Sequence, residues 1–429
     1  MHTKAMKITH TFSALSSAAL AAIFVSTPAL ANDPGNTLLR EALATTDDVS
    51  AGDAFAGGRT WFKSRLRMET VEQDGFAEDA QALTLRTVLG YESGTWNDMS
   101  ATVEFEDVSG FWLEDYNSTT NGNAGFPVVA DPTGAEVNQS FLSYSGIADT
   151  AVKFGRQRIT LGGHRFVGNV GWRQNEQTFE GLTLSTTKFA GAELFYAYIQ
   201  NVSRIFGSAS AAGNHRMESH LLNAVHQLGA IGKLTAYAYL LDYTKSAQFG
   251  MSSNTIGARF EGSRTLNDID FGYAVEIANQ NEAGDNPTER DADYLLLEAS
   301  AKAKGFTFKV GDELLGGSGA AGDSFQTPLA TLHKFNGWAD QFLATPAAGL
   351  EDFYFSVGTT VSDVKLAAVY HEFSSDTGGT DYGTELDFVA TYPVAKNVTA
   401  GLKYADFTAD DAGGYSDVTK TWLWLGYSF

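Results

Sequence analysis

From residue 59 onward, apolar and polar residues alternate with a period of two in one segment after another. In residues 269–280, for example, Phe271, Val275 and Ile277 share one face of an extended strand, and Glu276 lies on the opposite face. Successive side chains of a strand point to opposite sides, so this pattern predicts strands that meet an apolar environment on one side and water on the other.

The same pattern recurs often enough to build a large sheet. Eighteen strands are expected at approximately 59–72, 81–93, 99–107, 137–145, 150–159, 178–187, 191–202, 218–228, 232–243, 254–264, 269–280, 293–303, 306–315, 351–361, 364–373, 382–394, 398–406 and 417–429. Short connections alternate with mostly longer ones, as in outer-membrane barrels with periplasmic turns and extracellular loops. An even number of strands closes the sheet without a free edge, which the hydrocarbon of a bilayer requires. The predicted fold is therefore an all-β transmembrane antiparallel β-barrel of about 18 strands with long extracellular loops.

The C-terminal strand supports this prediction. Leu423, Leu425, Tyr427 and Phe429 lie on one face, and the sequence ends on that phenylalanine. A terminal Phe resembles the pattern that the barrel-assembly machinery recognises, so we expect this machinery to be a partner through Phe429. A soluble edge strand could end in the same way, so this signal needs support from elsewhere in the chain.

The N-terminus has the features of an export signal. Lys4 and Lys7 precede a small and apolar stretch over residues 12–25, followed by the small-x-small site at residues 29–31. We expect residues 1–31 to be a cleaved signal peptide, since the apolar run is shorter than the roughly 20 residues of a membrane-spanning helix. The expected mature organisation is a periplasmic segment over residues 32–58, with one short helical pattern, and an outer-membrane barrel over residues 59–429.

Composition agrees with an exported barrel. The chain has no cysteine, so an exported form has no disulfides, and its stability must come from hydrogen-bonded sheet and packing. The net charge of −22 argues against a nucleic-acid-binding protein, which needs a basic face. We expect localisation in the outer membrane of a Gram-negative bacterium, with membrane lipids and lipopolysaccharide as neighbours.

Charged residues on the polar faces of the strands are expected to point into the lumen. A charge at the lipid-facing midplane costs about 2–4 kcal/mol, whereas a hydrated channel accepts both signs. The candidate lumen charges are Lys63, Arg65, Arg67, Glu69, Arg86, Glu104, Arg259, Glu261 and Glu276. A soluble sandwich with one polar face would explain single strands equally well. It would not explain the strand count, the loop asymmetry and the terminal Phe together.

Two loops carry more organised sequence than connectors need. The loop after the fifth strand is rich in glycine, and it follows or contains the candidate constriction residues Arg156, Arg158, Arg165, Arg173 and Asn175. The longest loop contains the candidates for a second infolded segment, His333, Lys334, Asn336, Trp338 and Asp340. Arginine and amide side chains suit a constriction that hydrogen-bonds a solute. The alternative is that the arginines fasten the loop to acidic residues of the barrel wall.

These segments carry a family resemblance. The sequence FGRQR followed by GNVGWRQNEQTF, together with LATLHKFNGWAD and a GLED start to the next strand, resembles the alginate-export family of outer-membrane channels. The resemblance implies a monomeric barrel with an arginine-bearing constriction that attracts carboxylates. The chain is acidic and shorter than a dedicated exporter, so we expect a porin for passive diffusion of small polar or anionic solutes. Export of alginate or a similar anionic polysaccharide is the alternative.

Other chemistry is weakly indicated. Residues 317–322 spell a dinucleotide fingerprint, but no helix follows. The acidic residues 285–293 could hold calcium or bridge lipopolysaccharide, although no binding-loop spacing is present. A barrel hydrolase would need a nucleophile beside His164, His333 or His371, and none is evident in the sequence. A structural or adhesive barrel with a sealed lumen also remains an alternative. We expect no enzymatic activity, no metal and no cofactor.

Overall fold

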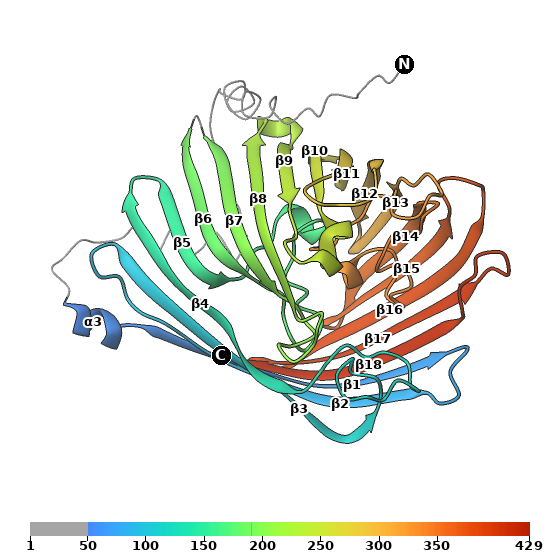
Figure 1. Cartoon of the computed structure of the whole chain (residues 1–429), viewed down its shortest axis with the longest axis horizontal. Coiled ribbons are helices and arrows are strands. Elements are labelled where there is room, and N and C mark those ends of the chain that lie inside the picture. Colours follow the sequence, from blue (N-terminus) through green and yellow to red (C-terminus); the bar gives the residue numbers. More distant parts are fainter. Residues whose placement is uncertain (1–49, 190) are drawn as a thin grey trace.

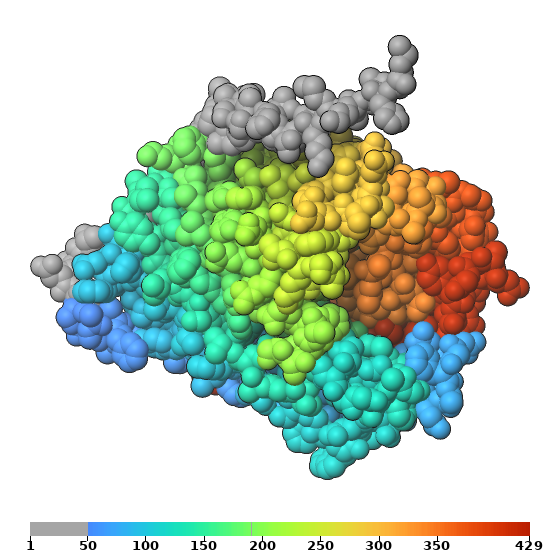
Figure 2. Space-filling view, viewed as in Figure 1, coloured from blue at the N-terminus to red at the C-terminus, as the bar shows by residue number. Residues whose placement is uncertain are grey.

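A computed structural model describes residues 50–189 and 191–429, and in it eighteen antiparallel strands form one closed sheet (Figure 1). The strands are β1 Arg59–Gln73, β2 Ala80–Glu92, β3 Met99–Asp115, β4 Gly134–Ile147, β5 Thr150–Gln157, β6 Thr178–Phe189, β7 Ala192–Ser203, β8 Asn214–Gln227, β9 Lys233–Leu241, β10 Ser253–Leu266, β11 Ile269–Glu282, β12 Asp291–Ala303, β13 Phe306–Leu315, β14 Leu350–Val361, β15 Val364–Ser374, β16 Asp381–Ala395, β17 Val398–Ala409 and β18 Val418–Ser428. The predicted fold class and the predicted number of strands are confirmed. Neighbouring strands follow one another around the wall in sequence order. On the face seen in Figure 2, the colours accordingly pass from cyan through green and yellow to red.

The two faces of the sheet differ as the alternation predicts. On β11, the outward side chains of Phe271, Val275 and Ile277 are 42–57% exposed, whereas the inward Glu276 is 2% exposed. Leu423 on β18 is likewise 49% exposed, and its inward neighbour is fully buried. The outward face therefore offers an apolar surface to lipid, and the polar side chains are kept inside.

The first and last strands close the barrel. β1 pairs with β18 from Lys63 opposite Ser428 to Gln73 opposite Val418. The terminal Phe429 extends this seam, since its backbone exchanges hydrogen bonds of 3.1 and 3.0 Å with Phe62. No strand edge of the described sheet is left open to lipid.

Short turns gather at one end of the barrel, which we call the turn side. In several of them, including the two described next, both central residues have positive φ, as type I′ two-residue hairpins require. The angles are 50° and 61° for Asn267 and Asp268, and 48° and 69° for Ser362 and Asp363. After glycine, polar residues such as Asn and Asp tolerate this backbone region best, which is why these dipeptides mark turns in the sequence. The longer connections lie at the opposite end, the loop side.

Element boundaries differ from the prediction mainly at β3. This strand extends to Asp115 rather than to residue 107, because it passes an irregularity opposite Ala82 and Thr84 and then continues to pair with β2. The six-residue helix α3, Ala51–Ala56, precedes β1, and the Ser50 side chain accepts a hydrogen bond from its first turn. The predicted signal peptide and the short helical pattern before residue 50 lie outside the described residues.

The loop-side half of the lumen is filled by side chains. Phe325 and Leu329 of the loop between β13 and β14 are fully buried, and Phe166 of the loop between β5 and β6 is 7% exposed. The Phe166 ring lies 5.1 Å from that of Tyr294 and 5.7 Å from that of Phe325. These two loops fold inside the barrel wall, and they position the candidate site.

Candidate functional site

The loops over residues 158–177 and 316–349, here called the loop pair, bind each other inside the barrel. Val167 and Leu329 form a parallel β-bridge, and the Gly168 N–H donates to the Leu329 carbonyl at 2.9 Å. The Lys334 ammonium donates to the carbonyl of Gly163 at 2.7 Å. The loop pair is therefore one packed unit, although its two halves are far apart in the sequence.

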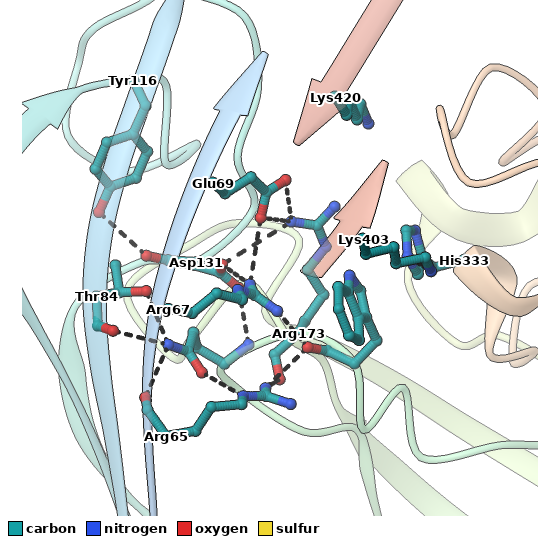
Figure 3. Close-up of polar contacts among 12 residues, drawn as sticks. Arg65, Arg67, Glu69, Thr84, Tyr116, Asp131, Arg173, His333, Lys403 and Lys420 are labelled. Carbon is teal, nitrogen blue, oxygen red and sulfur yellow. Dashed lines mark hydrogen bonds and ion pairs between the residues drawn. The ribbon is translucent and has the colours of Figure 1, made fainter. Parts of the chain in front are cut away.

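Arginines of β1 hold one turn of the loop pair against the wall. The Arg65 guanidinium donates to Gln174 Oε1 at 3.0 Å and to the Trp172 carbonyl at 2.8 Å. Arg67 donates to the same carbonyl and pairs with Asp131 of the loop between β3 and β4 (Figure 3). Both are among the predicted lumen charges, and both point inward. Asp131, which is fully buried, was not singled out from the sequence, since nothing local distinguishes a loop aspartate that folds inward.

Arg173 lies at the centre of this cluster. Its guanidinium lies 3.0 Å from Glu69 Oε2 and 2.9 Å from Asp340 Oδ2, and it is also 3.9 Å from Asp131. Burial acts to lower the pKa of Arg173, but the attraction of these three carboxylates outweighs it and raises that pKa. The Arg173 guanidinium is therefore a permanent cation whose contacts hold the loop pair against the wall (Figure 3).

Arg158 is the predicted arginine that is most accessible from the lumen. Its side chain is 28% exposed, and it donates to Glu176 at 2.7 Å and to Glu104 at 3.1 Å. Arg86 contacts Glu176 at 2.8 Å from the other side. Burial would raise the pKa of Glu176, but the attraction of Arg158 and Arg86 holds it well below its usual range. The carboxylates thus fix the Arg158 guanidinium at the edge of the loop pair.

Arg165 joins the loop pair to the wall on another side. It donates to Glu313 at 2.6 Å and to Asn336 Oδ1 at 3.0 Å, and the Asn336 amide bridges Glu313 and Asp352. Its side chain is 4% exposed, so it cannot present its charge to a solute in this conformation. Together with Arg173, it has the fastening geometry that the sequence left open as an alternative role.

Two further candidate constriction residues, Arg156 and Asn175, do not lie beside Arg158 at the deep end of the interior cavity. Arg156 shares the outward face of β5 with Phe154, which is 62% exposed, and pairs with Glu180 at 2.5 Å. It is not among the residues that line the interior cavity described below. Asn175 is 4% exposed and donates to the Pro132 carbonyl at 3.0 Å. The alternation of strand residues explains the outward position of Arg156, because its side chain follows Phe154 by two residues.

The second loop segment carries an aromatic cluster. The Trp172 ring stacks on His333 with a centroid distance of 5.1 Å and an interplanar angle of 6°. Lys403 of β17 lies 3.7 Å from the Trp338 ring centroid and donates to His333 Nε2 at 2.7 Å. His333 Nδ1 in turn lies 2.7 Å from Asp340 Oδ1. Trp422 completes the cluster, and only the inward position of that residue on β18 could have indicated it from the sequence.

A cavity of about 1600 Å³ extends from the turn side to the loop pair. Its outer part is lined by residues near the turns, such as Arg59 and Asp98, and its deep end by Arg158, Lys334 and Trp338. Hydroxyl, amide and charged side chains dominate this lining. We call this cavity the vestibule, and its deep end is formed by the loop pair.

The remaining predicted lumen charges lie on inward faces of the wall, and all of them except Lys63 form ion pairs there. Arg259 contacts Glu261 at 2.7 Å and Glu276 at 2.8 Å. Arg86 donates to Glu106 at 2.6 Å, and Glu104 is bound by Arg158 as described above. Lys63 lines the vestibule and has no ion pair within the described residues. Mixed charge therefore surrounds the vestibule, with most cations directly beside an anion.

No helix within residues 50–189 and 191–429 is long and apolar enough to cross a membrane. The same residues contain no group of three or more His, Asp or Glu side chains that could hold a metal ion.

Solved structures with the same architecture are numerous. Pseudomonas aeruginosa OccK9 (OpdG) matches with a TM-score of 0.68 and 16% identity, covering 88% of this chain and 99% of that chain. Acinetobacter baumannii OccAB2 matches with a TM-score of 0.67 and 16% identity over the same shares of the two chains. Pseudomonas aeruginosa OpdK, in a structure with vanillate, matches with a TM-score of 0.66 and 13% identity, covering 86% and 98%. At these identities the likeness establishes the fold, which is that of an outer-membrane porin.

Sequence comparison identifies the family of the chain, which the likeness in fold does not. No curated protein matches it. The alginate export family model, however, matches residues 62–316, which run from β1 to the start of the longest loop and include the first half of the loop pair. The chain belongs to the alginate export family.

Proposed function

We propose that this protein is an outer-membrane porin for passive diffusion of small hydrophilic solutes. The main support for this proposal is the cavity of about 1600 Å³, lined largely by polar residues, that leads from the turn side to the loop pair. Such a lining replaces part of the hydration shell of a solute without binding it tightly, as conduction requires. The proposal includes Gram-negative localisation, a monomeric state, and processing of residues 1–31.

The loop pair supplies the proposed constriction. Arg158 presents a partly exposed guanidinium to the deep end of the vestibule, where Glu104 and Glu176 fix its orientation. A guanidinium held in this way offers directed hydrogen bonds to the oxygens of a solute. Arg165 and Arg173 support the constriction from behind by binding the loops to the wall. The fold and family favour a channel without catalysis.

Reconstitution of the purified protein tests this function. In a planar bilayer, we expect stable ion current, and in liposomes we expect swelling with sugars and amino acids at rates that fall with solute size. A folded barrel that passes neither ions nor solutes would overturn the proposal. A silent barrel that released fatty acids from the lipid would indicate a hydrolase instead.

The family name supports one alternative, export of alginate or a similar anionic polysaccharide. An extended polyanion would have to pass the loop pair, whose buried residues fill the loop-side half of the lumen. Liposome swelling with oligouronates of increasing length separates the two functions. Swelling that persists for long oligomers would favour export, whereas a sharp cutoff after the shortest oligomers would favour the porin.

A further inference from the structure

One aromatic side chain of the vestibule lies along the wall of β1–β3. Trp61 of β1 is paired with Gly90 of β2, and its indole occupies the space that a Cβ of residue 90 would need. The indole reaches across this glycine and donates to Glu104 Oε2 on β3 at 2.6 Å. Arg59 lies 5.8 Å from the ring centroid, but its side chain is 54% exposed. Because one side of the indole lies against the backbone of β2, its other side points into the vestibule.

Tyr354 repeats this arrangement on another part of the wall. It lies on β14 and is paired with Gly311 of β13, and its ring occupies the space that a Cβ of residue 311 would need. The Tyr354 hydroxyl donates to Glu298 of β12 at 2.8 Å. The strands β15, β16, β17 and β18 separate this ring from Trp61. Each site therefore has an aromatic residue, a glycine and a glutamate on three adjacent strands.

Covering a glycine is also a structural role, since an aromatic ring packed over a glycine of the next strand stabilises the sheet. Tyr237 illustrates this role alone, because it covers Gly257, is 5% exposed and does not line the vestibule. Trp61 and Tyr354 both line the vestibule. Their hydrogen bonds to glutamates fix the two rings in place, so a solute that stacks on them has little side-chain entropy to overcome.

Hydrogen-bonding groups lie beside both rings. Glu104 accepts from Arg158 at 3.1 Å on its other oxygen, so the partly exposed guanidinium lies near the edge of the indole. Glu298 accepts from Lys309 at 2.8 Å, beside the phenol. A solute on either ring thus meets an apolar face below it and polar groups at its edge.

The wall of β4–β8 is lined mainly by uncharged polar side chains. Apart from Lys153 and Glu193, the cavity-lining residues of these five strands carry no charge, and most of them are Ser, Thr, Asn or Gln. Hydroxyl and amide groups donate and accept hydrogen bonds, as the hydroxyls of a sugar do. A pyranose ring combines such hydroxyls at its rim with faces of C–H groups. It therefore matches both the rings and this wall.

We propose that the Trp61 and Tyr354 rings form stacking sites for uncharged sugars in their cyclic form. The inference rests on the proposed function and specifies a substrate class for it. The C–H face of the sugar covers the lumen side of the ring, and the polar groups at the edge of the ring bind the sugar hydroxyls. The selected property is the flat ring of the solute, which an open-chain polyol of the same size lacks.

The test is the uptake of labelled glucose and sorbitol by liposomes that contain the purified protein. These two solutes have equal numbers of carbon and oxygen atoms, but only glucose forms a pyranose ring. We expect glucose flux to saturate with concentration and sorbitol flux to rise linearly. The variants Trp61→Leu and Tyr354→Leu should each raise the half-saturating glucose concentration about two- to tenfold, if a ring–sugar contact is as strong as an aromatic pair.

Two sets of variants separate stacking from other roles of the rings. Trp61→Phe and Tyr354→Phe keep a ring over each glycine and lose the hydrogen bond to glutamate, so they should keep most of the glucose saturation. The matched control replaces Trp112 and Tyr370 by leucine. These two residues are 91% and 41% exposed and lie outside the cavity lining, so the half-saturating concentration should not change.

The outcomes are distinct. Linear flux of glucose in the wild type, saturation by both solutes alike, or equal effects in the leucine variants and the control would overturn the inference and leave the porin standing. A wild-type protein that passes neither ions nor solutes would instead overturn the proposed function. Circular dichroism identifies any variant that does not fold, and the comparison of glucose with sorbitol on the wild type needs no variant.

Discussion

Two carboxyl groups of β16 show how single residues hold the loop pair. Glu385 Oε1 accepts the N–H groups of Trp338 and Ala339, the latter at 2.7 Å. Asp387 follows it by two residues on the same inward face, is fully buried, and has no hydrogen bond to either oxygen within the described residues. The Nε2 atom of His371 lies 3.7 Å from Asp387 Oδ2, and the adjacent carboxyl of Glu385 repels a negative charge on Asp387. An acid in this setting opposes folding, because its charge is poorly compensated.

The substitution Asp387→Asn should therefore stabilise the barrel. The amide has the same shape, carries no charge, and can donate to Glu385 Oε2, which also lacks a partner. We expect the free energy of unfolding to rise by about 1–3 kcal/mol, as measured by urea unfolding in lipid vesicles. Asp352→Asn is the matched control. Asp352 binds His371 at 2.7 Å, so the same change there should lower the free energy of unfolding. A loss of stability in both variants would contradict the assignment of Asp387 as uncompensated.

At the scale of elements, we expect the stability of the loop over residues 316–349 to depend on pH through His333 and Asp340. Burial, opposed by Asp340 and assisted by Lys403, lowers the pKa of His333 from 6.5 to about 3. Burial would raise the pKa of Asp340, but His333, Lys420 and Arg173 hold it well below its usual range. In both cases the unfolded chain binds a proton more readily than the folded one, so stability is lost as pH falls.

Acidification from pH 6.5 toward pH 4 should therefore weaken this anchor, by up to about 1.4 kcal/mol per pH unit for each proton taken up on unfolding. Urea unfolding across a pH series measures the slope. The variant His333→Gln removes the imidazole titration and should give a shallower profile over this range. Parallel profiles for the wild type and the variant would show that His333 does not contribute.

The strands were predictable because their signal is local and repeated. Alternation identified all eighteen, and the largest error, at β3, arose where the strand continues past an irregularity into a polar segment. The contacts of the loop pair were not predictable in the same way. Arg165 reaches Glu313 and Arg173 reaches Asp340 across 148 and 167 residues of sequence, and no short-range pattern specifies such partners. The sequence could therefore nominate the arginines but could not decide between binding a solute and fastening a loop.

At the scale of the whole molecule, closure brings the terminal Phe429 against the first strand. Its backbone pairs with Phe62, and its ring lies 5.8 Å from the Phe62 ring. The side chain is nevertheless 62% exposed on the outward face. A ring contact of this kind contributes about 0.5–1.5 kcal/mol, which is small for a barrel held by eighteen paired strands. Thermodynamic stability alone gives little reason for an aromatic residue at this position.

The substitution Phe429→Ala separates stability from recognition by the assembly machinery. It keeps the backbone pairing, so the free energy of unfolding of the refolded barrel should fall by only about 1 kcal/mol, as measured by urea titration in vesicles. If Phe429 is a recognition signal, the amount of folded barrel in cell envelopes should fall severalfold. Tyr427→Ala is the matched control, because Tyr427 is 41% exposed on the same face and its ring lies 6.0 Å from that of Phe429. Equal losses of envelope protein in both variants would assign the effect to packing of the seam. A loss confined to Phe429→Ala would show that the cell recognises the last residue before the barrel has closed.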